Sequence, residues 1–187
     1  MKKLSMICLY LLFPILLSAQ KSADFDTYFI DKTMRVDYFI TGDAGEYNVT
    51  LDEIYQTGDW AGNPKSLIDP FNNGHYYIRV YDANSNRLIY SKGFNSIFNE
   101  YITSKPAKDG IRKTYHKSAL IPYPKNPVIL VLEERGEFNL LHPLYKLKID
   151  PADYHIIKER SLTGTAVVEI LKSGPPSEKV DVVFLSE

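Results

Sequence analysis

The chain has 187 residues and a formal net charge of −1, from 22 Lys and Arg and 23 Asp and Glu. This balance argues against nucleic acid as a partner, because phosphate binding needs clustered positive charge. The chain has 1 Cys, Cys8, so a mature form without it would have no disulfide, no thiol nucleophile and no cysteine metal ligand.

Residues 1–20 have the pattern of a secretory signal peptide. Met1-Lys2-Lys3 is positively charged, residues 4–17 are almost wholly apolar, and Ser18-Ala19-Gln20 offers small residues for cleavage. The apolar stretch is too short for a transmembrane helix, which needs about 20 residues. We therefore expect export without a transmembrane anchor, to the periplasm, the cell surface or the medium.

The first half of the mature chain reads as β-strands. Residues 33–41 alternate, with Met34, Val36, Tyr38 and Ile40 on one face, and residues 47–51 resume the alternation after a turn at 42–46. Residues 59–64 are irregular and contain the only Trp, which we expect to plug one end of the core. Residues 75–81 and 87–92 form the arms of a hairpin around the loop 82–86.

The period changes after this hairpin. Phe94, Ile97, Phe98 and Tyr101 have helical spacing, and Asn95 or Ser96 is available as an N-cap. We expect one short helix near 95–102 that covers the strands. Residues 106–110 read as a loop.

Strands are predicted again at 112–121, 128–134, 144–149, 154–158 and 166–171. Three prolines between residues 122 and 127 exclude a central strand there and predict a bulged crossover or a sheet edge. About eight strands without a βαβ rhythm predict an all-β protein, an antiparallel β-sandwich of immunoglobulin or jelly-roll type.

The sequence ends with a loop-like segment, 172–179, followed by the apolar, β-branched residues 180–185. Such a strand needs neighbours and a covering layer. We expect it to begin a second, truncated domain, although it could fold back on the first. The expected organisation is a signal peptide at 1–20, the sandwich at 21–152, connecting strands and a linker at 153–179, and the start of the next domain at 180–187.

A search for catalytic and metal sites finds none. The sequence contains no His-Glu-x-x-His motif, and its four histidines are scattered over separate strands and loops: His75, His116, His142 and His155. Residues 150–155 combine Asp150, Asp153 and His155, but Asp-Pro and Asp-Tyr commonly form turns. Residues 82–86 open like a calcium loop, yet the turn glycine and the bidentate Glu are missing. We predict no catalytic residue, no metal ligand and no cofactor in this chain.

The chain is rich in aromatic residues, and exposed aromatic side chains can stack against sugars. Trp60, Tyr76 and Tyr81 form a candidate binding surface, against the alternative that alternate tyrosines belong to the core.

Several ordered blocks resemble a known family. Residues 25–38, 58–62, 94–101 and 121–128 are similar to blocks of the N-terminal domain of secreted IgA-peptidase-type zinc metallopeptidases, and residues 179–187 to the first strand of their peptidase domain. The resemblance implies a β-sandwich followed by a zinc endopeptidase domain. The zinc ligands and catalytic glutamate of the family lie in a downstream motif that no position here matches, so zinc is expected only in the missing domain.

The resemblance therefore implies a non-catalytic accessory module. Its expected partners are the peptidase domain of the same parent protein, which it would pack on or help to fold, and a protein substrate. The alternative is a free-standing secreted module that binds glycan or a host protein. An independent hydrolase that uses scattered His and Asp residues is the third reading.

Overall fold

The computed structural model describes residues 23–159 together with residues 170, 171, 174, 178, 179 and 182. The expected signal peptide and most of the expected strands at 166–171 and 180–185 lie outside the described residues. The domain boundaries proposed from the sequence stay predictions.

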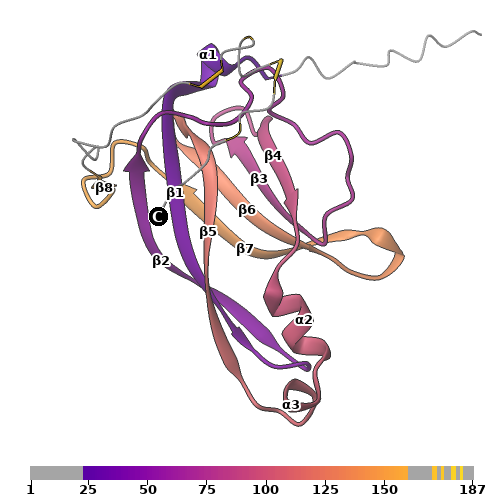
Figure 1. Cartoon of the computed structure of the whole chain (residues 1–187). Coiled ribbons are helices and arrows are strands. Elements are labelled where there is room, and N and C mark those ends of the chain that lie inside the picture. Colours follow the sequence, from indigo (N-terminus) through magenta and orange to yellow (C-terminus); the bar gives the residue numbers. More distant parts are fainter. Residues whose placement is uncertain (1–22, 160–169, 172–173, 175–177, 180–181, 183–187) are drawn as a thin grey trace, which may run out of the picture.

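Eight strands form two four-stranded sheets in the described part of the chain (Figure 1). They are β1 (Phe29–Gly42), β2 (Tyr47–Thr57), β3 (Tyr76–Asp82), β4 (Leu88–Phe94), β5 (Lys113–Pro124), β6 (Val128–Arg135), β7 (Leu141–Ile149) and β8 (Ile157–Lys158). The first sheet, sheet A, has the order β5-β1-β2-β8, and the second, sheet B, has the order β4-β3-β6-β7. Every ladder is antiparallel except that between β2 and β8. The predicted antiparallel β-sandwich is confirmed.

The core lies between the two sheets and follows the predicted alternation. Met34, Val36, Tyr38 and Ile40 of β1 are all buried. They meet the inward side chains of sheet B, which are equally buried: Tyr76, Ile78, Val80, Val128, Leu130 and Leu132. Burial of this size is the main force that holds two sheets face to face.

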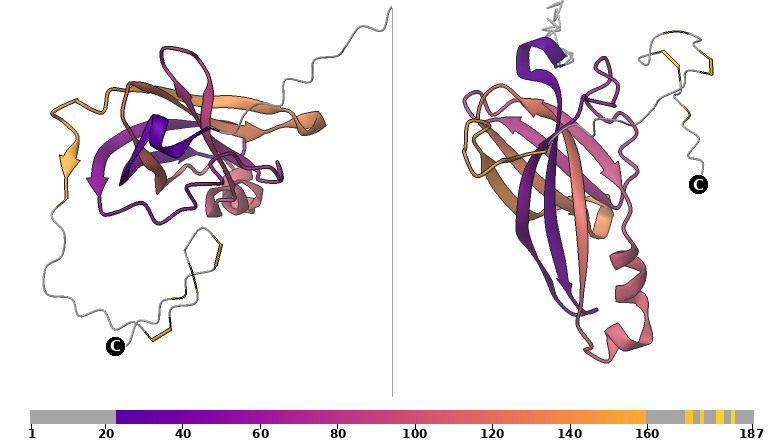
Figure 2. Two further views of the ribbon diagram at one scale, coloured as in Figure 1. Left: turned by 90° about the horizontal axis from the view of Figure 1, so that it is seen from above. Right: turned by 60° about the vertical axis from the view of Figure 1, so that its left-hand side comes forward.

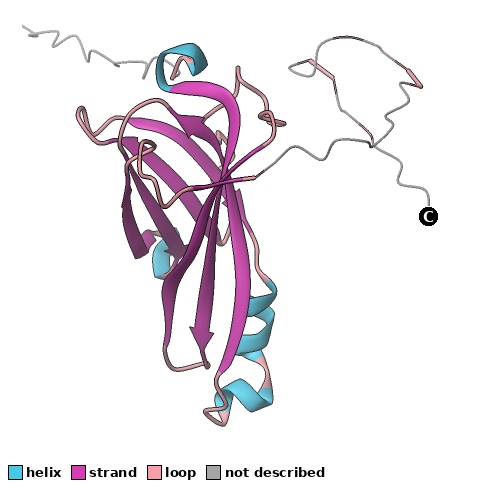
Figure 3. Ribbon diagram, turned by 90° about the vertical axis from the view of Figure 1, so that its left-hand side faces the viewer, coloured by secondary structure: helices cyan, strands magenta, loops and turns pink. Residues whose placement is uncertain are grey.

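The strands β1, β2 and β5 extend past the end of sheet B, and helices cover the extension (Figure 3). The helix α2 (Ile97–Thr103) begins after Ser96, whose hydroxyl accepts a hydrogen bond from the backbone N–H of Phe98. The predicted helix near 95–102 is therefore confirmed. Its expected apolar face is partly wrong, because Phe94 continues β4 opposite Tyr76 and Ile97 is 62% exposed.

The structure adds two short helices to the predicted one. These helices, α1 (Phe25–Tyr28) and α3 (Lys105–Lys108), each begin at a capping side chain, Asp24 for α1 and Ser104 for α3. In α3, Pro106 lies in the first turn, where a missing N–H costs nothing. The segment expected to be a loop at 106–110 is thus helical in its first part. A 3-10 turn, η1 (Glu137–Asn139), joins β6 to β7.

The proline-rich segment ends an edge strand. Pro122 and Pro124 belong to β5, which pairs only with β1 among the described strands. Its register shifts opposite the segment between Ile30 and Thr33. This confirms the predicted edge, where a residue without an N–H breaks no ladder on the free side.

The loop 82–86 is the tip of the β3–β4 hairpin, as predicted. The Asp82 carboxylate accepts hydrogen bonds from the backbone N–H and the hydroxyl of Ser85, at 2.8 and 2.5 Å. The strand expected at 154–158 is reduced to Ile157–Lys158, which lies beside β2 at the far edge of sheet A (Figure 2).

Candidate functional site

The β2–β3 loop, residues 58–75, folds back along the edges of the two sheets. At its start, the Gly58 carbonyl accepts a hydrogen bond from the Thr33 N–H at 2.9 Å. Farther on, the loop runs along β4: the Ser91 N–H donates to the Leu67 carbonyl at 2.9 Å, and the Asp69 N–H donates to the Ser91 hydroxyl at 2.9 Å. These bonds fasten the loop to sheet A and to sheet B, so the space beneath it is held open.

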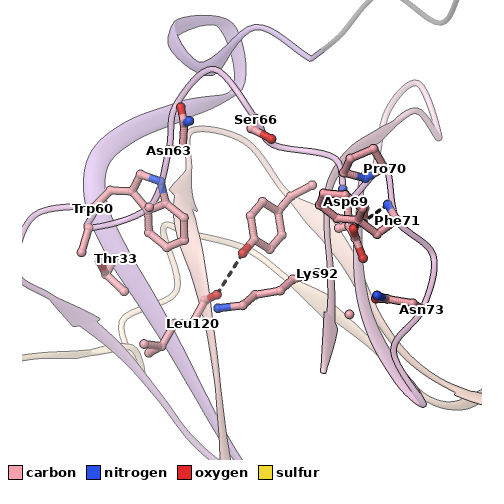
Figure 4. Close-up of a pocket in the computed structure, with 15 residues that line it drawn as sticks. Thr33, Trp60, Asn63, Ser66, Asp69, Pro70, Phe71, Asn73, Lys92 and Leu120 are labelled. Atoms are coloured by element: carbon pink, nitrogen blue, oxygen red, sulfur yellow. Dashed lines mark hydrogen bonds between the residues drawn. The ribbon is translucent and has the colours of Figure 1, made fainter. Parts of the chain in front are cut away.

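That space is a pocket of about 530 Å³ between the loop and the edges of β4 and β5. Figure 4 shows Trp60 on one side of the pocket and Asp69, Phe71 and Asn73 on the other, with Lys92 between them. Aromatic walls with a few polar groups are typical of ligand pockets.

The Trp60 indole is positioned by its contacts with two neighbours. Its ring meets the Tyr90 ring edge to face, with centroids 5.9 Å apart and planes at 83°. Gly62 lies directly against it, because a Cβ at this position would be 2.3 Å from Trp60 Cζ2. The indole N–H is buried and has no hydrogen-bond partner among the described residues. An unpaired buried donor costs about 1–3 kcal/mol.

The two charged side chains that line the pocket, Asp69 and Lys92, differ in their contacts. Both oxygens of Asp69 are occupied, by the Tyr77 hydroxyl at 2.8 Å and the Phe71 N–H at 2.9 Å. No carboxylate of the described residues pairs with the exposed Lys92 ammonium. The Tyr90 hydroxyl donates to the Leu120 carbonyl at 3.5 Å, and burial raises its pKa to about 12. The pocket thus offers aromatic surface and a cation, which suits binding.

The structure does not bring the three residues of the candidate binding surface together. Trp60 lines the pocket. Tyr76 is fully buried, its ring stacks on Phe94 at 5.6 Å, and burial raises the pKa of its hydroxyl. A surface position is therefore wrong for Tyr76, since it points inward from β3. Tyr81 is half-buried near the end of β3 and does not line the pocket.

Sequence reasoning missed Phe71 and Lys92. Phe71 is 78% exposed and follows Pro70 in a run of turn-forming residues. An aromatic residue inside such a run is a signal that could have identified it, since turns otherwise consist of polar residues and glycine. Lys92 carries no comparable signal, because a lysine on an edge strand is common.

The candidate metal ligands form local turns. The Asp153 carboxylate accepts hydrogen bonds from the backbone N–H of His155 at 3.0 Å and pairs with its Nδ1 at 2.9 Å. These two contacts, the backbone one first, lower the pKa of Asp153. Asp150 accepts from the Ala152 N–H. Within the described residues, no three His, Cys, Asp or Glu side chains are arranged to hold a metal ion.

None of the helices in the described ranges is both long and apolar enough to cross a membrane.

Comparison with known families gives one match. The family model described as "Peptidase M64 N-terminus" matches residues 24–146, from the capping residue of α1 to β7. The matched segment includes the strands β1 to β6 and the first part of β7, so it covers strands of both sheets. No curated protein matches the chain.

Proposed function

This chain belongs to the peptidase M64 N-terminus family, of the IgA-peptidase type, and we propose that it is a non-catalytic accessory domain of an exported zinc metallopeptidase. The domain would pack on the peptidase domain of the same parent protein, support its folding, or help to engage its protein substrate. The parent protein would be the enzyme, and this domain would contribute no catalytic residue.

The observation that carries the proposal is the family match over both sheets of the sandwich. The sequence agrees with it, because its 187 residues contain no His-Glu-x-x-His motif for zinc-dependent hydrolysis. The matched region is built around a continuous hydrophobic core, which suits a scaffold better than a mobile lid. Zinc and its catalytic glutamate would then lie in the neighbouring domain.

The test compares the purified chain with its full-length parent protein. We expect the chain alone to bind no stoichiometric zinc, by elemental analysis, and to leave casein intact. We expect the parent to bind zinc and to lose folded yield or casein hydrolysis when residues 21–159 are deleted. Metal-dependent cleavage of casein by the purified chain would overturn the proposal, and so would a parent without a zinc-binding domain.

A second candidate function is a free-standing module that binds glycan or a host protein. The Trp60 pocket favours it, because the pocket presents the exposed Lys92 side chain beside aromatic walls. A glycan array tests it with three variants of the chain. Trp60→Ala and Lys92→Ala should both abolish binding with the fold intact, whereas Lys146→Ala on β7 should not. Absence of binding by the unsubstituted chain would contradict it.

A further inference from the structure

Arg135, at the end of β6, fastens two loops to each other. Its Nη2 donates to the Asn72 carbonyl at 3.0 Å and to the Asn72 side-chain oxygen at 2.9 Å, both in the β2–β3 loop. Its Nε donates to the Gly74 carbonyl at 2.9 Å in the same loop. Its Nη1 donates to the Asn139 carbonyl at 2.9 Å, in the turn between β6 and β7. One guanidinium therefore holds both loops with four hydrogen bonds.

The same two loops hold three of the four residues other than glycine that have a positive φ in the described part of the chain. Outside glycine, positive φ occurs at Asn72 (48°), Asn86 (53°), Phe138 (56°) and Asn139 (60°). Asparagine tolerates this conformation, but an aromatic residue is strained in it. Two successive residues with positive φ form the turn of the β6–β7 hairpin, where Asn-Gly is the favoured pair. Phe138 thus occupies a position for which Asn or Gly is better suited.

The Phe138 side chain makes little packing contact that would offset this backbone strain. It is 88% exposed, and Leu140 in the same turn is 58% exposed. Phe71, beside Asn72 in the other loop, is 78% exposed. Figure 1 shows the β6–β7 hairpin projecting past the edge of sheet B. Strained residues held by their surroundings are typical of functional sites, and preorganised aromatic side chains are typical centres of interfaces.

The area that this surface can bury indicates which kind of partner it can bind. With two phenylalanines that each bury about 150–250 Å² at most, it offers roughly 300–500 Å² of aromatic area. A stable complex of separate proteins buries about 800 Å² on each side. A domain tethered in the same polypeptide needs less area, because the linker holds it at an effective concentration in the millimolar range.

From these observations we infer that Phe138 and Phe71, held by Arg135, form the surface by which this domain docks on an apolar pocket of the peptidase domain in the same polypeptide. This inference rests on the proposed function, since it names the contact through which the accessory domain would act. The Phe138 turn is the part to test, because Phe71 also borders the Trp60 pocket.

The first experiment places the photocrosslinking residue benzoylphenylalanine at position 138 of the full-length parent protein. Position 154 is the matched control, because Tyr154 is a similarly exposed aromatic residue (87%) after β7. We expect position 138, and not 154, to crosslink to the peptidase domain in the same molecule, as mapped by mass spectrometry. A crosslink between two copies, a crosslink confined to this domain, or no crosslink would overturn the inference.

The second experiment uses Phe138→Asn, which relieves the strain and removes the ring. In the purified chain we expect its Tm to rise by about 3 °C. In the parent protein we expect proteolytic separation of the two domains to become at least tenfold faster, as for the loss of an interface anchor. Tyr154→Asn should change neither. An unchanged Tm or an unchanged rate would overturn the inference.

The two experiments separate this inference from the proposed function. If deletion of residues 21–159 impairs the parent enzyme while position 138 forms no crosslink to the peptidase domain, the proposed accessory function is supported and the proposed docking surface is refuted. If the parent protein has no peptidase domain, both the proposed function and the docking surface are refuted.

Discussion

Replacement of Phe98 by Ala should release α2 from the extended end of sheet A. Phe98 is fully buried, and its ring lies 5.0 Å from that of Tyr47 on β2 and 5.7 Å from that of Tyr115 on β5. It also contacts Tyr101 of its own helix at 6.4 Å. No other side chain of α2 is as deeply buried, so Phe98 is the main anchor of the helix.

The expected loss of unfolding free energy follows from the burial of Phe98 and from the short length of α2. Truncation of a buried Phe to Ala costs about 3–5 kcal/mol, including the aromatic pairs that it removes. A helix of seven residues has no stability of its own and depends on tertiary packing. We therefore expect Phe98→Ala to lower the free energy of unfolding by about 4 kcal/mol.

Urea denaturation of the purified chain measures this loss, and native-state hydrogen exchange reports on α2 separately. Ile97→Ala is the matched control, since Ile97 precedes Phe98 in the same helix but is 62% exposed. It should change the free energy of unfolding by less than about 0.5 kcal/mol. Equal losses for the two variants, or a loss below about 1 kcal/mol for Phe98→Ala, would refute this account of the anchor.

Two further outcomes are expected for the purified chain. Burial raises the pKa of Tyr38 and Tyr90 to about 12 from 10.0. The hydroxyl of each tyrosine therefore holds its proton more tightly in the folded state than in the unfolded state. This difference contributes roughly 2–3 kcal/mol to the free energy of unfolding; the contribution is complete below about pH 10 and is lost as the pH rises to about 12. Urea denaturation across this range should show a shallower decline for Tyr38→Phe, and an unchanged slope would count against the buried hydroxyl. Gly62→Ala should displace the Trp60 indole, because its Cβ would lie 2.3 Å from Cζ2, and should shift the Trp fluorescence to longer wavelength. Gly58→Ala, with no heavy atom within 4 Å of its Cβ, should leave the spectrum unchanged, and identical spectra for both variants would contradict the close contact.

Local periodicity predicted the sheets better than the helices. The alternation of Met34, Val36, Tyr38 and Ile40 survives in the structure because one face of β1 is buried throughout. Phe94 was assigned to the helix pattern, and its pairing with Tyr76 on β3 places it in the strand β4 instead. Such a choice depends on a neighbour far along the chain, which local spacing does not show.

The candidate site was only partly predictable for the same reason. Trp60 was identified as the single Trp in an irregular loop, but its pocket depends on the loop folding back to Ser91. The Arg135 contacts were not foreseen, since they join the β2–β3 loop to the β6–β7 turn. Phe138 carried little signal, because the connection contains Gly136, a residue suited to positive φ, whereas the left-handed positions fall on Phe138 and Asn139.

The pairing of β1 with β5 governs the order in which this domain can fold. Gly42 is opposite Lys113 and Phe29 is opposite Pro124, so β1 meets its second neighbour only after the β3–β4 hairpin and α2 have been synthesised. Closing so long a loop is entropically costly, and topologies rich in distant pairings fold in milliseconds to seconds. During synthesis the β1 edge of the β1–β2 hairpin therefore stays open to other chains until β5 is made, and any factor that keeps the emerging polypeptide extended would protect it from aggregation.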